Sequence, residues 1–339
     1  MAKAKTITGI DCGSLAIDAI GPVLATRLEE MCALRARALD STDPEGVHDM
    51  RVSSRRLRGA LSDFAPYLSK RGLNDAVKEI TILADALGEV RDQDVAILGL
   101  EKLAAQAPGE ATVTLKDSIR ARVAIRNRAR RDLQKLLRQT ALKQLQINFA
   151  EQVNAVIEKS KLRMTKSKKT HHGNVLYGEM AHRIVFDRLK ELERLSDAFY
   201  HPLKTKPLHK MRIAAKHLRY ALELFEQCLG PGTALFARKI AALQTSLGEL
   251  HDCDVWIETF GRQLKIATRE AEKNRVTGSL WLLGHFVRLH SKHLRSALSH
   301  WEEWEATDSG NQLRKLIEDN SPKLPPEPTE PSVLPAASA

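Results

Sequence analysis

The chain has 339 residues, of which 43 % are hydrophobic and 5 % aromatic, and its lysines and arginines exceed its aspartates and glutamates by 11. This hydrophobic content excludes a wholly disordered chain, and no apolar run reaches the ~18 residues that a transmembrane helix needs. The positive excess favours a polyanionic partner such as nucleic acid, a phosphate polymer or an acidic surface. We therefore expect a soluble, cytoplasmic protein without a membrane segment.

Apolar residues recur at helical spacing along most of the chain, and leucine, alanine, arginine and glutamate dominate its composition, so the sequence predicts an all-α fold. Glycine and proline clusters mark the expected helix ends. In chain order, the expected helices cover 15–40, 47–68, 74–105, 112–145, 174–200, 208–229, 233–264 and 272–305.

The expected helices form two groups, separated by a basic stretch without periodicity. The end of the chain is rich in proline and cannot pack a core, so we expect it to be disordered. The predicted organisation is a leader at 1–14, a first helical repeat at 15–158, a basic linker at 159–173, a second helical repeat at 174–308 and a tail at 309–339.

The four cysteines show none of the paired spacings that are typical of metal sites. They are Cys12, Cys32, Cys228 and Cys253. We expect them to be buried free thiols in a reducing cytosol, and we expect no metal and no cofactor.

One basic stretch, from Val47 to Arg58, occurs again from Leu208 to Arg219. A rotation of about 100° per residue places the basic groups of each copy on one stripe about 80° wide, opposite an apolar face. The stripes contain His48, Arg51, Arg55 and Arg58 in the first copy, and His209, Arg212, Lys216 and Arg219 in the second. Neither stripe contains a carboxylate, and like charges at this spacing repel one another. The pattern favours an anion-binding face, although one copy alone could be a solvated helix surface.

A second repeated block runs from Leu87 to Val95 and again from Leu247 to Val255. Its copies are separated by 160 residues and those of the basic stretch by 161. A nearly constant offset predicts an internal duplication, here two four-helix bundles related by a pseudo-two-fold axis. The block contributes Asp92 and Asp94, and then Asp252 and Asp254, which we expect to orient arginines or to form ion pairs between helices.

The two repeated blocks together resemble the CHAD domain, the conserved histidine α-helical domain, over about residues 15–305. The resemblance implies two helical bundles with a basic central cavity that binds inorganic polyphosphate, and association with polyphosphate granules. Members are sometimes linked to a triphosphate-tunnel enzyme domain, but the Glu-x-Glu-x-Lys motif of that domain is missing. We therefore expect a binding module and not an enzyme. Lys216 and His251 depart from the pattern, because the first copy has Arg55 and Arg91 there.

The predicted polyphosphate site combines the two stripes with basic residues of the last helix of each repeat. Arginine grips phosphate oxygens in bidentate fashion, lysine acts as a point charge, and a polyanion would raise the pKa of nearby histidines. Binding should therefore strengthen as the pH falls through about 6–7. The predicted site residues are His48, Arg51, Arg55, Arg58, Arg126, Arg130, His209, Arg212, Lys216, Arg219, Arg288, Lys292 and Arg295.

Three other functions stay open at this point. His209, His251 and Asp252 are typical ligand types of a metal-dependent phosphohydrolase, but Arg91 at the equivalent position excludes a duplicated metal site. A nucleic-acid binder would share the positive charge, although few aromatic residues are available for base stacking. A helical scaffold whose basic surface recruits an acidic protein is not excluded by the sequence.

Overall fold

The computed structural model describes residues 5, 7, 9–68, 72–166, 175–270 and 272–320. Within these residues the chain forms helices and no strand, which confirms the predicted all-α class. No helix among them is long and apolar enough to cross a membrane. The α-helices are α1 Ala16–Ala33, α2 Arg35–Leu39, α3 Gly46–Phe64, α4 Asn74–Ala104, α5 Gly109–Leu136, α6 Gln139–Lys166, α7 Tyr177–Glu193, α8 Thr205–Leu224, α9 Glu226–Leu229, α10 Thr233–Arg269, α11 Lys273–Ala306 and α12 Ser309–Asp319.

Two predicted boundaries are wrong because apolar periodicity continues through a change of chain direction. The single helix expected at 112–145 is two helices, α5 and α6, with a break after Leu136. The side chain of Leu137 is fully buried at this break, and its carbonyl accepts a hydrogen bond of 2.7 Å from Arg35 Nε on α2. Likewise, the helix expected at 15–40 is interrupted at Leu34.

Two segments that were expected to lack structure are partly helical. Helix α12 occupies 309–319, where we had placed the start of the disordered tail, because Leu313 and Ile317 bury their side chains in the main core. Helix α6 extends to Lys166 and so includes the first part of the expected linker. The rest of both segments, 167–173 and 321–339, lies outside the described residues.

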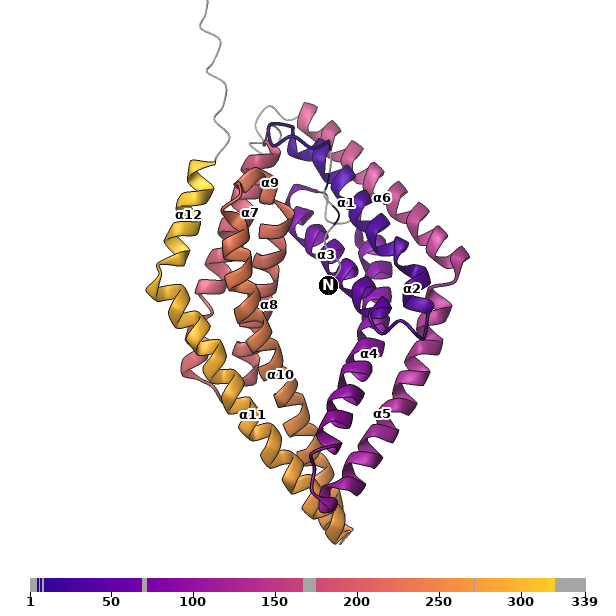
Figure 1. The fold of residues 1–339 in the computed structure, drawn as a ribbon. Coiled ribbons are helices and arrows are strands. Elements are labelled where there is room, and N and C mark those ends of the chain that lie inside the picture. Colours follow the sequence, from indigo (N-terminus) through magenta and orange to yellow (C-terminus); the bar gives the residue numbers. More distant parts are fainter. Residues whose placement is uncertain are drawn as a thin grey trace, which may run out of the picture.

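Two long helical hairpins, α4 with α5 and α10 with α11, diverge from the main body and meet again at their far ends (Figure 1). A second, smaller core joins these ends, and each of the four helices contributes to it, for example Leu100 of α4, Leu115 of α5, Phe260 of α10 and Phe286 of α11. Arg122 of α5 also lies over the Trp256 ring of α10, 4.8 Å from its centroid. The hairpins are therefore held together at both ends.

The main core lies where helices of the first and second halves of the chain pack together. Helix α3 contacts α8, and α1 contacts α7. The Phe64 and Phe225 rings, at the ends of α3 and α8, meet edge-to-face with 6.2 Å between centroids. Both side chains are fully buried, so the two basic helices share one core rather than belonging to separate domains.

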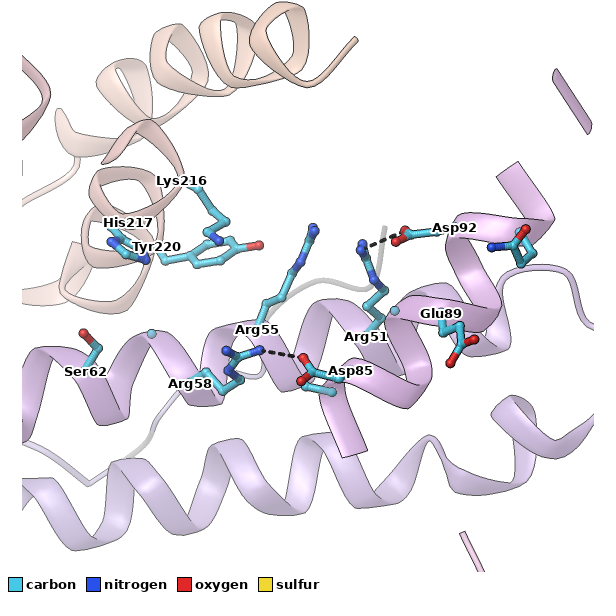
Figure 2. A pocket seen from close by; sticks show the side chains of 14 residues that line it. Arg51, Arg55, Arg58, Ser62, Asp85, Glu89, Asp92, Lys216, His217 and Tyr220 are labelled. Carbon is cyan, nitrogen blue, oxygen red and sulfur yellow. Dashed lines mark hydrogen bonds and ion pairs between the residues drawn. The ribbon is translucent and has the colours of Figure 1, made fainter. Parts of the chain in front are cut away.

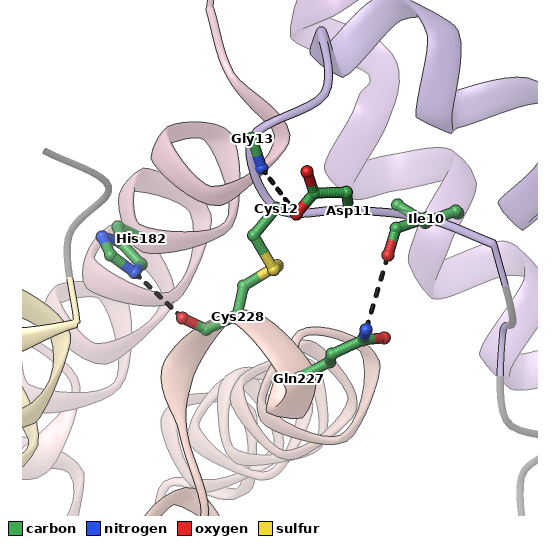
Figure 3. The surroundings of a disulfide bond; sticks show 7 residues. All are labelled: Ile10, Asp11, Cys12, Gly13, His182, Gln227 and Cys228. Atoms are coloured by element: carbon green, nitrogen blue, oxygen red, sulfur yellow. Dashed lines mark hydrogen bonds between the residues drawn. A yellow bond between two sulfur atoms is a disulfide. The ribbon is translucent and has the colours of Figure 1, made fainter. Parts of the chain in front are cut away.

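A disulfide joins Cys12, just before α1, to Cys228 of α9, with 5.6 Å between their Cα atoms. Beside it, Gln227 Nε2 donates a 3.4 Å hydrogen bond to the carbonyl of Ile10 (Figure 3). The expectation of free thiols is therefore wrong for these two cysteines, since 216 residues separate them in sequence and only the tertiary fold brings them together. Cys32 and Cys253 are free.

Candidate anion-binding cavity

The start of helix α3 fixes the orientation of the first basic stripe. A Cβ atom at Gly46 would lie 2.0 Å from the carbonyl oxygen of Arg37, so only glycine allows α3 to begin against α2. Arg37 Nη1 then donates a 2.9 Å hydrogen bond to the buried Asp49 carboxylate. Met50 and Leu57 are fully buried on the apolar face. The basic face of α3 consequently points away from the core, as its amphipathic pattern predicts.

Helices α3, α4 and α8 enclose a cavity of about 660 Å³. It contains most of the first stripe and part of the second, and Figure 2 shows these side chains converging from the three helices. The lining residues are Arg51, Arg55, Arg58, Gly59 and Ser62 of α3, Ala84, Asp85, Gly88, Glu89, Asp92 and Gln93 of α4, and Lys216, His217 and Tyr220 of α8.

The arginines of α3 differ in their partners. Arg51 donates a 3.0 Å hydrogen bond to Asp92, and Arg58 lies 3.7 Å from Asp85, so α4 supplies carboxylates that orient both groups. Arg55 has no ion pair within the described residues, and Figure 2 shows its guanidinium extending from α3 between Tyr220 and Arg51. The middle arginine of the stripe is therefore the one left available to an anion.

Lys216 of α8 faces the arginines of α3 without a carboxylate partner in the described part of the chain. Burial, together with the guanidinium groups of Arg55, Arg212 and Arg58, lowers the pKa of Lys216 to about 8. Burial and Arg55 also lower the pKa of Arg212, although Asp252 and Asp92 partly offset this effect. Without a bound anion, the cations of the two stripes repel one another across the cavity.

His209, the first residue of the second stripe, lies outside the cavity lining and faces a histidine of α10. The His209 and His251 rings, from α8 and α10, lie 4.7 Å apart between centroids. Burial, Arg212 and Lys216 lower the pKa of His209. Burial, Arg212 and His209 lower the pKa of His251 to about 4. Both rings are therefore mostly neutral at pH 7, and His209 Nδ1 is buried without a hydrogen-bond partner among the described residues.

His48 lies at the corresponding place in α3, in different surroundings. Burial and Arg91 lower its pKa, whereas Glu45 and Asp49 act in the opposite direction. In the described residues, Glu45, His48 and Asp49 are also the set of three whose ligand atoms lie within 4.8 Å of one another. Their carboxylates are already engaged, because Glu45 lies 3.7 Å from Arg91 and Asp49 binds Arg37.

Arg219 is placed differently from what the stripe predicts. It is only 9 % exposed, lies 3.4 Å from Glu223, and stacks over the Tyr220 ring with 4.9 Å to its centroid. It does not line the cavity, whereas Arg58, its counterpart in the first stripe, does. On α8 the cavity is lined instead by Lys216, His217 and Tyr220.

The basic residues predicted on the last helices also lie outside the cavity lining. Arg126 and Arg130 of α5 each lie 3.7 Å from Asp94 of α4, so they form an ion-pair cluster behind the wall. In the second half, His290 occupies this position, 3.2 Å from Asp254. The last three predicted cations are exposed on α11, namely Arg288, Lys292 and Arg295.

Sequence reasoning missed several lining residues, chiefly Tyr220, His217 and Ser62, and the carboxylates Asp85 and Glu89. The carboxylates could have been found from their spacing, since Asp85, Glu89 and Asp92 follow one another by four and three residues on one helix face. His217 belongs to the repeated motif, but only the packing of α8 shows that it faces inward.

Comparisons with known proteins agree with this architecture. Among curated proteins, no relative was found. The fold is similar to the crystal structure of the CHAD domain from the plant Ricinus communis, with a TM-score of 0.65, 20 % identity, and coverage of 88 % of this chain and 95 % of that one. It is also similar to PptA from Streptomyces chartreusis, with a TM-score of 0.57, 17 % identity, and coverage of 85 % and 100 %. The family model of the CHAD domain matches residues 22–261, so the chain belongs to the CHAD domain family.

Proposed function

We propose that the chain binds inorganic polyphosphate in the cavity between α3, α4 and α8. The observation that carries this proposal is the convergence of Arg51, Arg55, Arg58 and Lys216 on one cavity, with Arg55 and Lys216 lacking a carboxylate partner in the described residues. Gathering partly buried like charges costs free energy, as the lowered pKa of Lys216 shows, and a bound polyanion offsets this cost. Membership of the CHAD family supports the same ligand.

The geometry favours a phosphate polymer over a single phosphate or a nucleic acid. Orthophosphate would engage one guanidinium fork at a time, whereas a polymer spans several forks at once. A nucleic acid would need accessible aromatic rings for base stacking. Tyr220, the aromatic residue of the lining, is 6 % exposed and is covered on one face by Arg219. The cavity therefore offers charge without a stacking platform.

The proposed contacts fall into three groups. Arg51, Arg55, Arg58, Arg212 and Lys216 would bind phosphate oxygens directly. His48 and His209 would contact the polymer where it leaves the cavity, and Asp92 and Asp252 would orient arginines. Asp94 pairs with Arg126 and Arg130, and Asp254 contacts His290. The remaining predicted cations would extend the binding surface outside the cavity, namely Arg126, Arg130, Arg219, Arg288, Lys292 and Arg295.

We also propose that the two halves, over 15–158 and 174–308, are structural repeats related by a pseudo-two-fold axis. Residues at equivalent positions, 161 apart, meet one another, as expected for an isologous contact. Leu15 pairs with Leu176 in an antiparallel bridge, and Phe64 meets Phe225. A Cβ atom at Gly59 would lie 3.6 Å from the ring of Tyr220, again its equivalent.

The decisive experiment is a titration of the protein with polyphosphates of graded length at two salt concentrations. We expect affinity to rise with chain length, and we expect replacement of Arg55 and Lys216 by alanine to abolish most of the binding. A matched control is the double variant Arg120→Ala/Arg262→Ala, which removes the same charge from side chains that are 80 % and 70 % exposed outside the cavity. Equal loss in both variants would show that only net charge matters.

Two outcomes would support other functions. Competition by DNA as strong as that by polyphosphate at physiological salt would favour a non-specific nucleic-acid binder. Shortening of polyphosphate chains in the presence of Mg²⁺ or Mn²⁺ would favour a metal-dependent phosphohydrolase. For the proposed binding module we expect neither result, and no cofactor is required.

The family resemblance further predicts a cytoplasmic protein associated with polyphosphate granules. This prediction rests on the proposed ligand, because granule binding would use the same cavity. A fluorescent fusion of the wild type should concentrate on granules, whereas one carrying Arg55→Ala/Lys216→Ala should spread evenly. Granule localisation that survives these substitutions would contradict the prediction.

A further inference from the structure

The two halves of the molecule carry different kinds of cation at equivalent positions. At four positions where the first half has arginine, the second half has lysine or histidine: Arg55 corresponds to Lys216, Arg56 to His217, Arg91 to His251 and Arg130 to His290. At two others, Arg51 and Arg58, the second half keeps arginine, as Arg212 and Arg219. Arginine keeps its charge at every physiological pH, whereas histidine is charged only when it takes up a proton. The replacements therefore add titratable groups to a second half that also keeps permanent cations.

We propose that His217 of α8, in the cavity, and His251 of α10, beside His209, form a proton-dependent extension of the anion site, so that polyphosphate binding is coupled to proton uptake by these two side chains. This inference rests on the proposed function, because it concerns the same ligand. It adds two residues that the basic stripes did not include, and it assigns them a role in anion binding that depends on their protonation.

His217 lies inside the cavity, next to Lys216 on α8 and across from Arg58 of α3. Helix α7 packs against it with Arg188 and Glu191, and Arg188 is held by Asp63 of α3 at 2.7 Å. Burial, Arg188 and Lys216 lower the pKa of His217 to about 4, and Glu191 offsets this only in part. Its Nδ1 is buried without a partner in the described residues.

His251 of α10 lies outside the cavity lining, beside His209 at the start of the second stripe. Its ring meets that of His209, and the charged groups that face it are Arg212 of α8 and Asp92 of α4. The repulsion from Arg212 outweighs the attraction of Asp92, and with burial it keeps the free ring neutral. Both histidines are thus neutral for one shared reason, which is that each is half-buried beside permanent cations.

A bound polyanion reverses this balance. Its charges neutralise the neighbouring guanidinium and ammonium groups and attract a proton to each imidazole, so the pKa of His217 and His251 rises in the complex. A group whose pKa rises on binding strengthens binding as the pH falls, from the pKa in the complex down to the pKa in the free protein. The window therefore runs from about 6.5, the ordinary value of histidine, down to about 4.

Behind the wall, the same replacement alters an ion pair. Arg130 lies 3.7 Å from Asp94 in the first half and is always charged, whereas His290 lies 3.2 Å from Asp254 and pairs with it as a cation only when protonated. Nearby, His293 Nδ1 lies 2.8 Å from Glu249. The second half thus has histidine–carboxylate contacts in a region where the first half has an arginine–carboxylate pair.

The test measures affinity for long-chain polyphosphate between pH 5 and pH 8 at constant ionic strength. Long chains are needed because only terminal phosphates titrate in this range, with a pKa near ~6. For the wild type we expect affinity to rise about tenfold from pH 7.5 to pH 5.5. Calorimetry in two buffers of different ionisation enthalpy should show net proton uptake. Circular dichroism at each pH confirms that the protein stays folded.

Double substitutions at positions 217 and 251 test whether these two histidines cause the pH dependence of binding. His217→Gln/His251→Gln should hold affinity at the low, neutral-pH level throughout and abolish most of the proton uptake. His217→Arg/His251→Arg, which restores the residue types of the first half, should raise affinity at pH 7.5 and flatten the profile to within about twofold. His201→Gln, an exposed loop histidine, is the matched control and should behave as wild type.

The outcomes separate this inference from the proposed function. A wild-type profile that is flat, or a steep profile that survives His217→Gln/His251→Gln, would overturn the inference while arginine-dependent binding at pH 8 stands. Failure of the wild type to bind polyphosphate at any pH would overturn both.

Discussion

Two walls of the cavity come from α3 and α8, the helices that carry the two copies of the repeated basic stretch, and their side chains differ in charge and in partners. Helix α3 presents Arg51, Arg55 and Arg58, two of which are oriented by carboxylates of α4. Helix α8 presents Lys216 and His217, without carboxylate partners at the cavity. The first wall is permanently charged and pre-oriented, whereas in the second wall we propose that His217 gains its charge when the ligand binds. Two copies of one motif can thus give one anchoring and one adjustable surface.

The largest effect should come from removing the cations of both walls together. The quadruple variant Arg51→Ala/Arg55→Ala/Arg212→Ala/Lys216→Ala should lose about 1,000-fold in affinity, or ~4 kcal/mol. Because like-charge repulsion is relieved, its free energy of unfolding should be unchanged or slightly higher. Isothermal titration measures the affinity, and chemical denaturation measures the free energy of unfolding.

The double variants compare the contributions of α3 and α8. At pH 8, Arg51→Ala/Arg55→Ala on α3 should lower the affinity for polyphosphate more than Arg212→Ala/Lys216→Ala on α8. Equal losses of affinity in the two double variants would show that α3 and α8 contribute equally to binding.

The disulfide ties the leader of the first half to α9 of the second. Replacing both cysteines, as Cys12→Ser/Cys228→Ser, should lower the free energy of unfolding by about 2–4 kcal/mol, because the bond closes a long loop in the unfolded chain. Affinity for polyphosphate should change by less than about threefold, since the α3–α8 core holds the walls in place. Thermal melts with and without reductant test the predicted loss of stability. A large loss of affinity would mean that the bond sets the spacing of the walls.

Arg58 and Arg219 occupy equivalent positions with different surroundings. Arg219→Met should lower the free energy of unfolding by about 1–3 kcal/mol, because it leaves the half-buried Glu223 without one of its partners. Arg58→Met removes a side chain that is 43 % exposed, so stability should change by less than about 0.5 kcal/mol while affinity falls several-fold. Urea denaturation paired with binding assays measures both variants. A loss of affinity in Arg219→Met without a loss of stability would show that Arg219 contacts the ligand.

The smallest effect concerns Lys216 at alkaline pH. Its pKa is about 8 in the free protein, so below pH 8 it is already charged and binding needs no further proton. Above pH 8 the ligand must restore the proton, and affinity should fall by up to about tenfold as the pH rises towards 10.5, the ordinary lysine value. Lys216→Arg should remove this decline. An unchanged decline in that variant would place the titrating group elsewhere.

Much of the site could be read from the sequence because the basic stripe is a local property of one helix. Spacing alone placed Arg51, Arg55 and Arg58 on one face, and the structure brings them to one cavity. The same reasoning failed for Arg219, because its guanidinium is held away from the cavity by Glu223 and the Tyr220 ring, which spacing along one helix does not reveal. It also missed Ser62 and Tyr220, which line the cavity through contacts between helices.

By itself, the sequence determined the helical class, the doubled basic motif and the excess of positive charge, since all three depend on residue types at short spacing. Only the tertiary structure decided the break after Leu136, the Cys12–Cys228 bond, the second core that joins the hairpin ends, and the position of His217 in the cavity lining. These features depend on which distant groups share a buried space. The charge of a histidine or lysine is set by that space and not by its neighbours in the chain.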